Sequence, residues 1–152
     1  MTACRRPGSE PDLELLAAVL DHVQADSASP LPTKILRTSI PLPEDDALAL
    51  SLNLARFCFP SGADIPALLE HLDRINEAPI HWKNAPSALR PSVLSETHAS
   101  RYAFTRPAHV GSSALIYAEL QHCALCGFGT YFLLTRTDTG WGVVGECQVW
   151  AS

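Results

Sequence analysis

Apolar positions recur with two different periods along the chain, three to four residues in the first half and two residues in the last third. The first half holds three stretches with helical spacing, at 11–26, 47–57 and 64–75. Apolar residues three or four positions apart give each stretch one buried face. Asp64 is placed to cap the third helix, and Pro66 in its first turn costs no hydrogen bond.

Runs of β-branched and aromatic residues predict the strands. They lie at 34–40, 92–95, 102–105, 114–121, 130–136 and 141–150. Alternation is clearest in the last three runs, which are joined by short connections rich in turn residues. Short connections force neighbouring strands to pair antiparallel, so the last third predicts a β-meander. The run at 102–105 is expected at the edge of the sheet.

These elements predict an α+β fold. The N-terminal helices are expected to pack on one face of a curved antiparallel sheet of four or five strands, with the β-meander at its C-terminal end. A cystatin-like sheet is the nearest familiar shape, by analogy alone. Residues 1–11 are expected to form a flexible leader and residues 12–152 a single domain, a length sufficient for an ordinary core.

Charge limits the classes of partner. Eleven Lys and Arg residues against sixteen Asp and Glu give a formal net charge of −5. The longest basic run is Arg5-Arg6, whereas a nucleic-acid binder needs clustered cations. We therefore expect no nucleic acid, and a protein or small-molecule partner instead. No stretch approaches the roughly 20 apolar residues that span a bilayer.

The first four residues, Met-Thr-Ala-Cys, are similar to the end of a bacterial lipobox, which makes Cys4 the candidate lipidation site. A lipid at Cys4 is the only membrane attachment that we expect. We favour the simpler interpretation, an ordinary start with an unrelated cysteine, because four residues match easily by accident. An upstream signal would favour the periplasm or cell envelope, and its absence the cytoplasm.

The strongest local signal is the pair Cys123 and Cys126 after His122, between the two clearest strands. Such a pair forms a disulfide, half of a zinc site or a redox couple. Zinc would need further ligands, of which His122 and Cys147 are the nearest, and a redox couple would need a helix N-terminus. We favour a disulfide or two packed thiols, with Cys58 and Cys147 as a second, less favoured pair. We expect no metal or cofactor.

Glycines 127 and 129 supply the backbone freedom that a tight turn needs after this pair. The aromatic residues are spread along the chain, and we expect core packing rather than a ligand-binding floor. Trp141 and Tyr131 fall on neighbouring strands and are expected to pack as a cross-strand pair. Trp82, Trp150 and Tyr117 complete this set.

No local pattern marks an enzyme: HExxH, GxSxG, Walker A and EF-hand sequences are all absent. Cys58 with His71 is an imaginable nucleophile and base, yet nothing nearby marks either residue. The carboxylates at 44–46 lie at a predicted helix start, where they already interact with the helix dipole. We assign no catalytic residue, and we favour a protein that is not an enzyme.

The C-terminal run carries a series of short motifs. They are Ser-Ala-Leu-Ile-Tyr at 113–117, Cys-Ala-Leu-Cys-Gly-Phe-Gly-Thr-Tyr-Phe-Leu-Leu at 123–134, Gly-Trp-Gly-Val-Val at 140–144 and Val-Trp-Ala-Ser at 149–152. This ending resembles that of a loose group of small, uncharacterised, often exported bacterial proteins. Asn76-Glu77-Ala78-Pro79 resembles their mid-chain Asn-x-x-Pro step. The match covers 113–152 well and the rest in outline.

The resemblance implies a location in the bacterial envelope and a non-enzymatic role, and it transfers no catalytic residue because the group has no established activity. Residues 105–111 depart from the group, since Pro107 stands where the group has a strand. That departure predicts weaker strand pairing at the edge of the sheet.

Two classes of function remain. The first is an exported or lipid-tethered binding or accessory domain, which predicts an exposed apolar or aromatic patch on the sheet. The alternative is a small enzyme whose site lies in the concavity of the sheet and uses His122 or a free cysteine. That alternative predicts a pocket with convergent polar groups and a strongly perturbed titratable residue. We favour the first.

Overall fold

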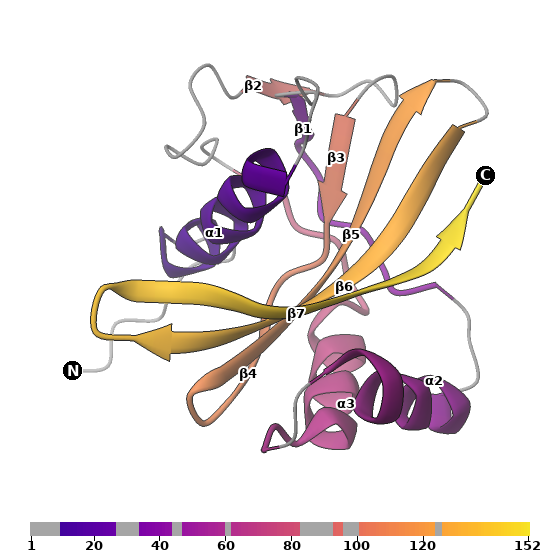
Figure 1. Cartoon of the computed structure of the whole chain (residues 1–152). Helices are drawn as coiled ribbons and strands as arrows, with labels where there is room; N and C mark the ends of the chain where they lie inside the picture. Colours follow the sequence, from indigo (N-terminus) through magenta and orange to yellow (C-terminus); the bar gives the residue numbers. More distant parts are fainter. Residues whose placement is uncertain are drawn as a thin grey trace.

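A computed structural model describes residues 10–26, 34–43, 47–59, 62–82, 93–95, 101–123 and 126–152. Its helices are α1 (Glu10–Asp26), α2 (Ala47–Asn53) and α3 (Ile65–Ile75), and a π-helical turn, η1 (Leu54–Cys58), continues α2. The chain is α+β, as predicted (Figure 1). None of the described helices is both long and apolar enough to cross a membrane.

The strands form one mixed sheet. They are β1 (Lys34–Leu36), β2 (Val93–Ser95), β3 (Arg101–Phe104), β4 (Ala108–Val110), β5 (Ser113–Cys123), β6 (Cys126–Thr137) and β7 (Gly140–Ala151). Their order is β2-β1-β3-β5-β6-β7, and β4 also pairs with β5. The predicted meander is present, because β5, β6 and β7 are consecutive antiparallel neighbours.

The sheet differs from the prediction in two ways. It has more strands than four or five and is not wholly antiparallel, since β1 runs parallel to both β2 and β3. Strand β3 covers the run predicted at the edge, yet it lies between β1 and β5. Parallel pairing needs a long crossover, which the segment carrying α2 and α3 provides between β1 and β2. Local periodicity does not reveal such distant pairing.

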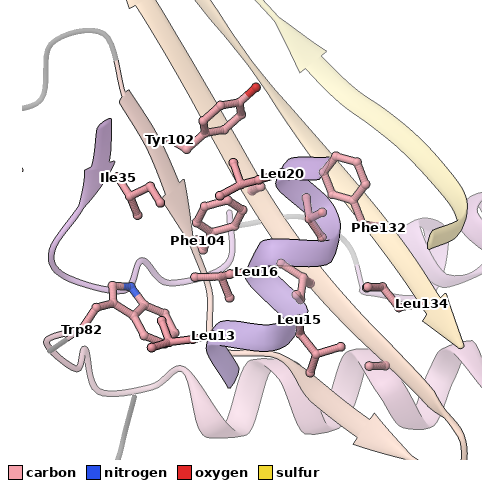
Figure 2. Close-up of a cluster of buried hydrophobic side chains, with 14 of the residues drawn as sticks. Leu13, Leu15, Leu16, Leu20, Ile35, Trp82, Tyr102, Phe104, Phe132 and Leu134 are labelled. Atoms are coloured by element: carbon pink, nitrogen blue, oxygen red, sulfur yellow. The ribbon is translucent and has the colours of Figure 1, made fainter. Parts of the chain in front are cut away.

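Helices cover both faces of the sheet, not one face as predicted. Helix α1 packs on one face, where the core cluster shown in Figure 2 includes Leu13, Leu16, Leu20, Trp82, Tyr102, Phe104 and Phe132. On the other face α3 and η1 contribute to a second cluster with Leu54, Leu68, Leu72, Tyr117, Tyr131 and Leu133. Successive strand residues point to opposite faces, so each long strand serves both clusters.

Two β-bulges divide β7. The register with β6 skips Val144 and Val149, which have no partner in the ladder. Before the first bulge, Trp141 and Val143 pack against the α1 side. Beyond it, Cys147 packs against the α3 side. One strand therefore contacts helices on opposite faces of the sheet.

Two polar residues fix the ends of α3. Asp64 caps its start, accepting a hydrogen bond from the Ala67 backbone N–H at 3.1 Å, as the sequence predicted. Asn76 is buried at its end, where its side-chain amide donates to the Leu72 and Arg106 carbonyls and its oxygen accepts from the Arg106 N–H at 2.8 Å. Asn76 thereby joins the helix to the segment before β4.

The predicted Trp141–Tyr131 pair is wrong. The turn between β6 and β7 places Thr137 opposite Gly140, and this register sets Trp141 opposite Arg136. The Arg136 guanidinium lies 5.8 Å from the centre of the Trp141 ring. Tyr131 instead packs on the other face of the sheet.

Candidate functional site

Three side chains from β5 and β7 form a chain of hydrogen bonds. The Trp150 indole N–H donates to the Tyr117 hydroxyl at 2.6 Å, and that hydroxyl donates to Glu119 Oε1 at 2.9 Å. Tyr117 and Glu119 are two residues apart on one strand, so their side chains share a face of the sheet. We call Trp150, Tyr117 and Glu119 the hydrogen-bonded trio. The Tyr117 hydroxyl donates its single proton to Glu119. It holds the Glu119 carboxylate by one oxygen.

Gly129 on β6 makes the trio sterically feasible. It lies opposite Glu119 on one side and Trp150 on the other. A Cβ atom at this position would overlap the Trp150 Nε1 atom and the Tyr117 hydroxyl. Any side chain here would therefore separate the donor from its acceptor. A glycine within a strand often marks such a close approach.

Burial sets the protonation of Tyr117. The side chain is fully buried and packs on Tyr131, with ring centres 4.9 Å apart. Desolvation raises the pKa of the Tyr117 hydroxyl above its ordinary value; the hydrogen bond from Trp150 opposes this rise, and the Glu119 carboxylate adds to it. Tyr117 is consequently a neutral donor at physiological pH.

A buried cation lies within electrostatic reach of the trio. Arg101 on β3 is 5% exposed, and in the strand register it lies opposite Gln121 of β5. Burial lowers the pKa of its guanidinium, and the charge of Glu119 opposes that effect. Arginine remains protonated at neutral pH because its ordinary pKa exceeds 12. Arg101 therefore offsets part of the Glu119 charge without lining the cleft described next.

An open cleft of about 380 Å³ adjoins the trio. It is lined by Glu119, Leu120, Gln121, Cys126, Gly127, Trp150 and Ser152. The Ser152 N–H donates to the Gly127 carbonyl at 2.9 Å, which fixes one wall against β6. Among the described residues, the second carboxylate oxygen of Glu119 makes no hydrogen bond. The cleft thus offers a held carboxylate beside a half-exposed indole ring.

A second hollow, of about 420 Å³, lies between α2 and β7, and we call it the α2 groove. It is lined by Ala49, Leu50, Asn53, Leu54, Cys147, Gln148 and Val149. In the described part of the chain, its lining is mainly apolar and includes no charged side chain. The sequence analysis pointed to neither hollow, because each combines residues that are distant along the chain.

The structure brings Cys58 and Cys147 together, with sulfur atoms 2.02 Å apart and Cα atoms 5.4 Å apart. This was the less favoured of the two predicted pairs. Cys126 is also disulfide-bonded. Cys123 faces it across the β5–β6 hairpin, but the Cys123 side chain lies outside the described part. The Cys123–Cys126 disulfide therefore stays a prediction, although the pair does lie between strands rather than at a helix start.

A catalytic pair of Cys58 with His71 and a zinc site with Cys147 were the alternatives considered for the cysteines and histidines. Cys58 is disulfide-bonded, so it offers no thiol to His71, whose Nδ1 atom accepts from the His109 backbone N–H at 3.3 Å. Cys147 is likewise engaged and does not complete a zinc site. No cluster of three or more potential metal ligands occurs among the described residues. The side chain of His122 lies outside them.

Two further predictions fall outside the described part of the chain. Residues 1–9 of the predicted leader, with the candidate lipidation site Cys4, are one of them, and the carboxylates at 44–46 are the other, whereas residues 10 and 11 of that leader belong to α1. Sequence reasoning named Tyr117 and Trp150 only as scattered aromatics, and it missed Glu119 and Arg101. Gly129, within a strand otherwise rich in large residues, was the available signal.

Comparison with known proteins adds no relative: no family model, curated protein or solved structure matches the chain. The resemblance of residues 113–152 to exported bacterial proteins accordingly stays a prediction.

Proposed function

We propose that the protein is a non-enzymatic binding domain whose cleft receives a cationic group rich in N–H donors, a guanidinium or primary ammonium. The observation that supports this most strongly is the Glu119 carboxylate. One of its oxygens is held by Tyr117 at 2.9 Å, and the other makes no hydrogen bond among the described residues. A carboxylate accepts only, so its natural ligand donates.

The other cleft walls suit the same ligand. Trp150 is 36% exposed and hydrogen-bonded at its indole N–H, so the ring is held in place. Cations are attracted to the face of an indole ring. Because Arg101 offsets part of the Glu119 charge, hydrogen-bond donation should matter as much as net charge.

Binding accounts for the site better than catalysis does. The cleft has convergent polar groups and Tyr117 has a perturbed pKa, which are features expected of the enzyme alternative. However, the pKa is moved away from neutrality, whereas general acid–base catalysis at pH 7 needs a group that titrates near that pH. The described lining includes no histidine, and Cys126 is disulfide-bonded. No nucleophile with an adjacent base is described.

We also propose an oxidising location such as the cell envelope, reached by export or by a lipid at Cys4. The Cys58–Cys147 bond and the bonded state of Cys126 support this, because disulfides persist mainly outside reducing compartments. Intact mass after thiol labelling of native protein tests it. Protection of Cys58, Cys123, Cys126 and Cys147 is expected, whereas labelling of all five cysteines would exclude it.

The ligand class is tested with two matched probes, N-acetylarginine amide and its neutral analogue N-acetylcitrulline amide. Binding is followed by the Trp150 indole N–H resonance, assigned with a Trp150→Phe variant. A small cation in an open cleft should bind with a Kd of about 1 mM, equivalent to about −4 kcal/mol. We expect the citrulline probe to bind at least tenfold more weakly.

Two variants locate the response. Glu119→Gln keeps an acceptor for Tyr117 and removes the charge, so arginine binding should weaken at least tenfold. An unchanged chemical shift for the Trp150 indole N–H in the free variant would show that the trio persists. Glu146→Gln is the matched control, because Glu146 lies on β7 near His22 and outside the cleft. Equal binding of both probes, or binding of N-acetylglutamate amide instead, would refute the proposal.

A further inference from the structure

The cleft and the α2 groove are neighbours along β7. Val149 lines the groove and Trp150 lines the cleft. In a regular strand two successive side chains would point to opposite faces. Here Val149 is the unpaired residue of a bulge, and it packs against the α3 side of the sheet. The Trp150 indole reaches Tyr117 on that same side. Both hollows therefore open on one face.

The exposed large hydrophobic side chains of the described residues lie on the elements that border the groove, and among them only Trp150 lines either hollow. In the described part of the chain, the large hydrophobic residues that are exposed are Leu52, Phe57, Val144 and Trp150, at 61%, 74%, 44% and 36%. Two belong to α2 and η1 and two to β7. Concentrations of exposed apolar residues commonly mark interaction sites. This distribution favours a ligand larger than a single cation.

We infer that the ligand is an extended polypeptide segment that places a basic side chain in the Glu119 cleft and an apolar side chain in the α2 groove. The inference rests on the proposed function, because it uses the same cleft for the cation. Same-face side chains of an extended chain recur about every 7 Å, which suits two adjoining hollows. Among the described residues, the groove lining includes no charged side chain, whereas the cleft lining includes the Glu119 carboxylate.

A second copy of this chain fits less well as the occupant. The whole chain carries a formal charge of −5, and β7 contains one charged residue, Glu146. Two copies meeting through antiparallel β7 strands would bring their Glu146 carboxylates toward each other near the centre of the contact. Charge complementarity favours a basic segment of another protein.

The test compares capped peptides with the capped amino acid. The probes are Leu-Ala-Arg, its reverse Arg-Ala-Leu, Ala-Ala-Arg and N-acetylarginine amide, all measured by the Trp150 indole resonance. At least one leucine peptide should bind tenfold or more tightly than Ala-Ala-Arg, because its leucine is removed from water in the groove. Ala49→Gln fills the exposed groove wall and should abolish this gain. Ala55→Gln, an exposed change outside the groove lining, should preserve it.

The outcomes separate the two proposals. Leucine peptides that bind no better than Ala-Ala-Arg would overturn the polypeptide inference and leave cation binding intact. Leucine-dependent binding that is unaffected by Glu119→Gln would refute the shared cleft and overturn the polypeptide inference, while the N-acetylarginine amide titration separately decides the proposed function. A dimer in sedimentation velocity that Ala49→Gln dissociates would assign the groove to a second copy and overturn the inference.

Discussion

Gly129 on β6 lies directly beneath the indole of Trp150 on β7, at the place where any other residue would carry its side chain. This contact lets the indole N–H reach the Tyr117 hydroxyl at 2.6 Å. The arrangement of the candidate cleft therefore depends on the absence of one methyl group, and the first prediction tests that dependence.

Gly129→Ala should push the Trp150 ring away from Tyr117 and break the hydrogen bond between them. Overpacking of this kind costs about 1–3 kcal/mol of unfolding free energy. Urea unfolding and the indole N–H chemical shift measure the two effects. Gly142→Ala is the control, since a Cβ there would meet only Thr137 Cγ2 at 4.0 Å. Equal stability of the two variants would contradict the prediction.

Asn76→Ala should lower the free energy of unfolding by about 2 kcal/mol, because it leaves the Arg106 N–H without its partner in a partly buried place. Differential scanning calorimetry measures the loss. Asn53→Ala, an exposed helical site, should change stability by less than about 0.5 kcal/mol. A small effect at both sites would show that the Asn76 bridge is dispensable.

Replacing Cys58 and Cys147 together with serine should destabilise the protein, because the bond joins residues 89 positions apart. Chain entropy alone gives about 4–5 kcal/mol for a loop of this length. Guanidinium unfolding measures the change, with Cys4→Ser as the control. The double variant should also become insensitive to a reductant at concentrations that open only this bond. Stability equal to that of the unmodified protein would exclude a structural role.

Stability should fall at alkaline pH. Burial raises the pKa of both Tyr102 and Tyr117 above the ordinary value of 10.0. Above about pH 10 the unfolded chain loses these phenolic protons while the folded protein keeps them. The free energy of unfolding is therefore unaffected by them below pH 10 and decreases above it, by about 1.4 kcal/mol per pH unit for each tyrosine.

Urea unfolding between pH 8 and pH 11 measures this decrease. Tyr102→Phe removes one of the two groups and should halve the contribution that the pair makes to the slope. A slope that stays the same in this variant would show that Tyr102 titrates normally in the folded protein.

Local patterns predicted the elements better than their pairing. The meander follows from period-two alternation and short connections, and Asp64 could be recognised as a cap because capping involves residues three positions apart. The place of β1 inside the sheet depends on contacts such as Ile35 with Tyr102, which lie far apart in the sequence. The packing of helices on both faces of the sheet also depends on contacts between residues that lie far apart in the sequence.

The candidate site was harder to predict because it depends on register. Tyr117 and Trp150 are both visible as aromatics, but a hydrogen bond between them requires two specific strand pairings and the bulge at Val149. The same sensitivity explains the wrong Trp141–Tyr131 pairing, since a hairpin turn shifts every later partner. Gly129 was predicted to supply freedom for a tight turn, and that prediction is wrong, because it lies within β6, opposite Glu119 and Trp150.

The bulges at Val144 and Val149 also bear on association between chains. Strand β7 is twelve residues long and ends the described sheet, a position where unpaired backbone groups commonly template aggregation. The bulges interrupt that template and leave Gly145–Gln148 as the regular stretch between them. The protein can therefore present a long outer strand without offering an uninterrupted ladder for fibril growth.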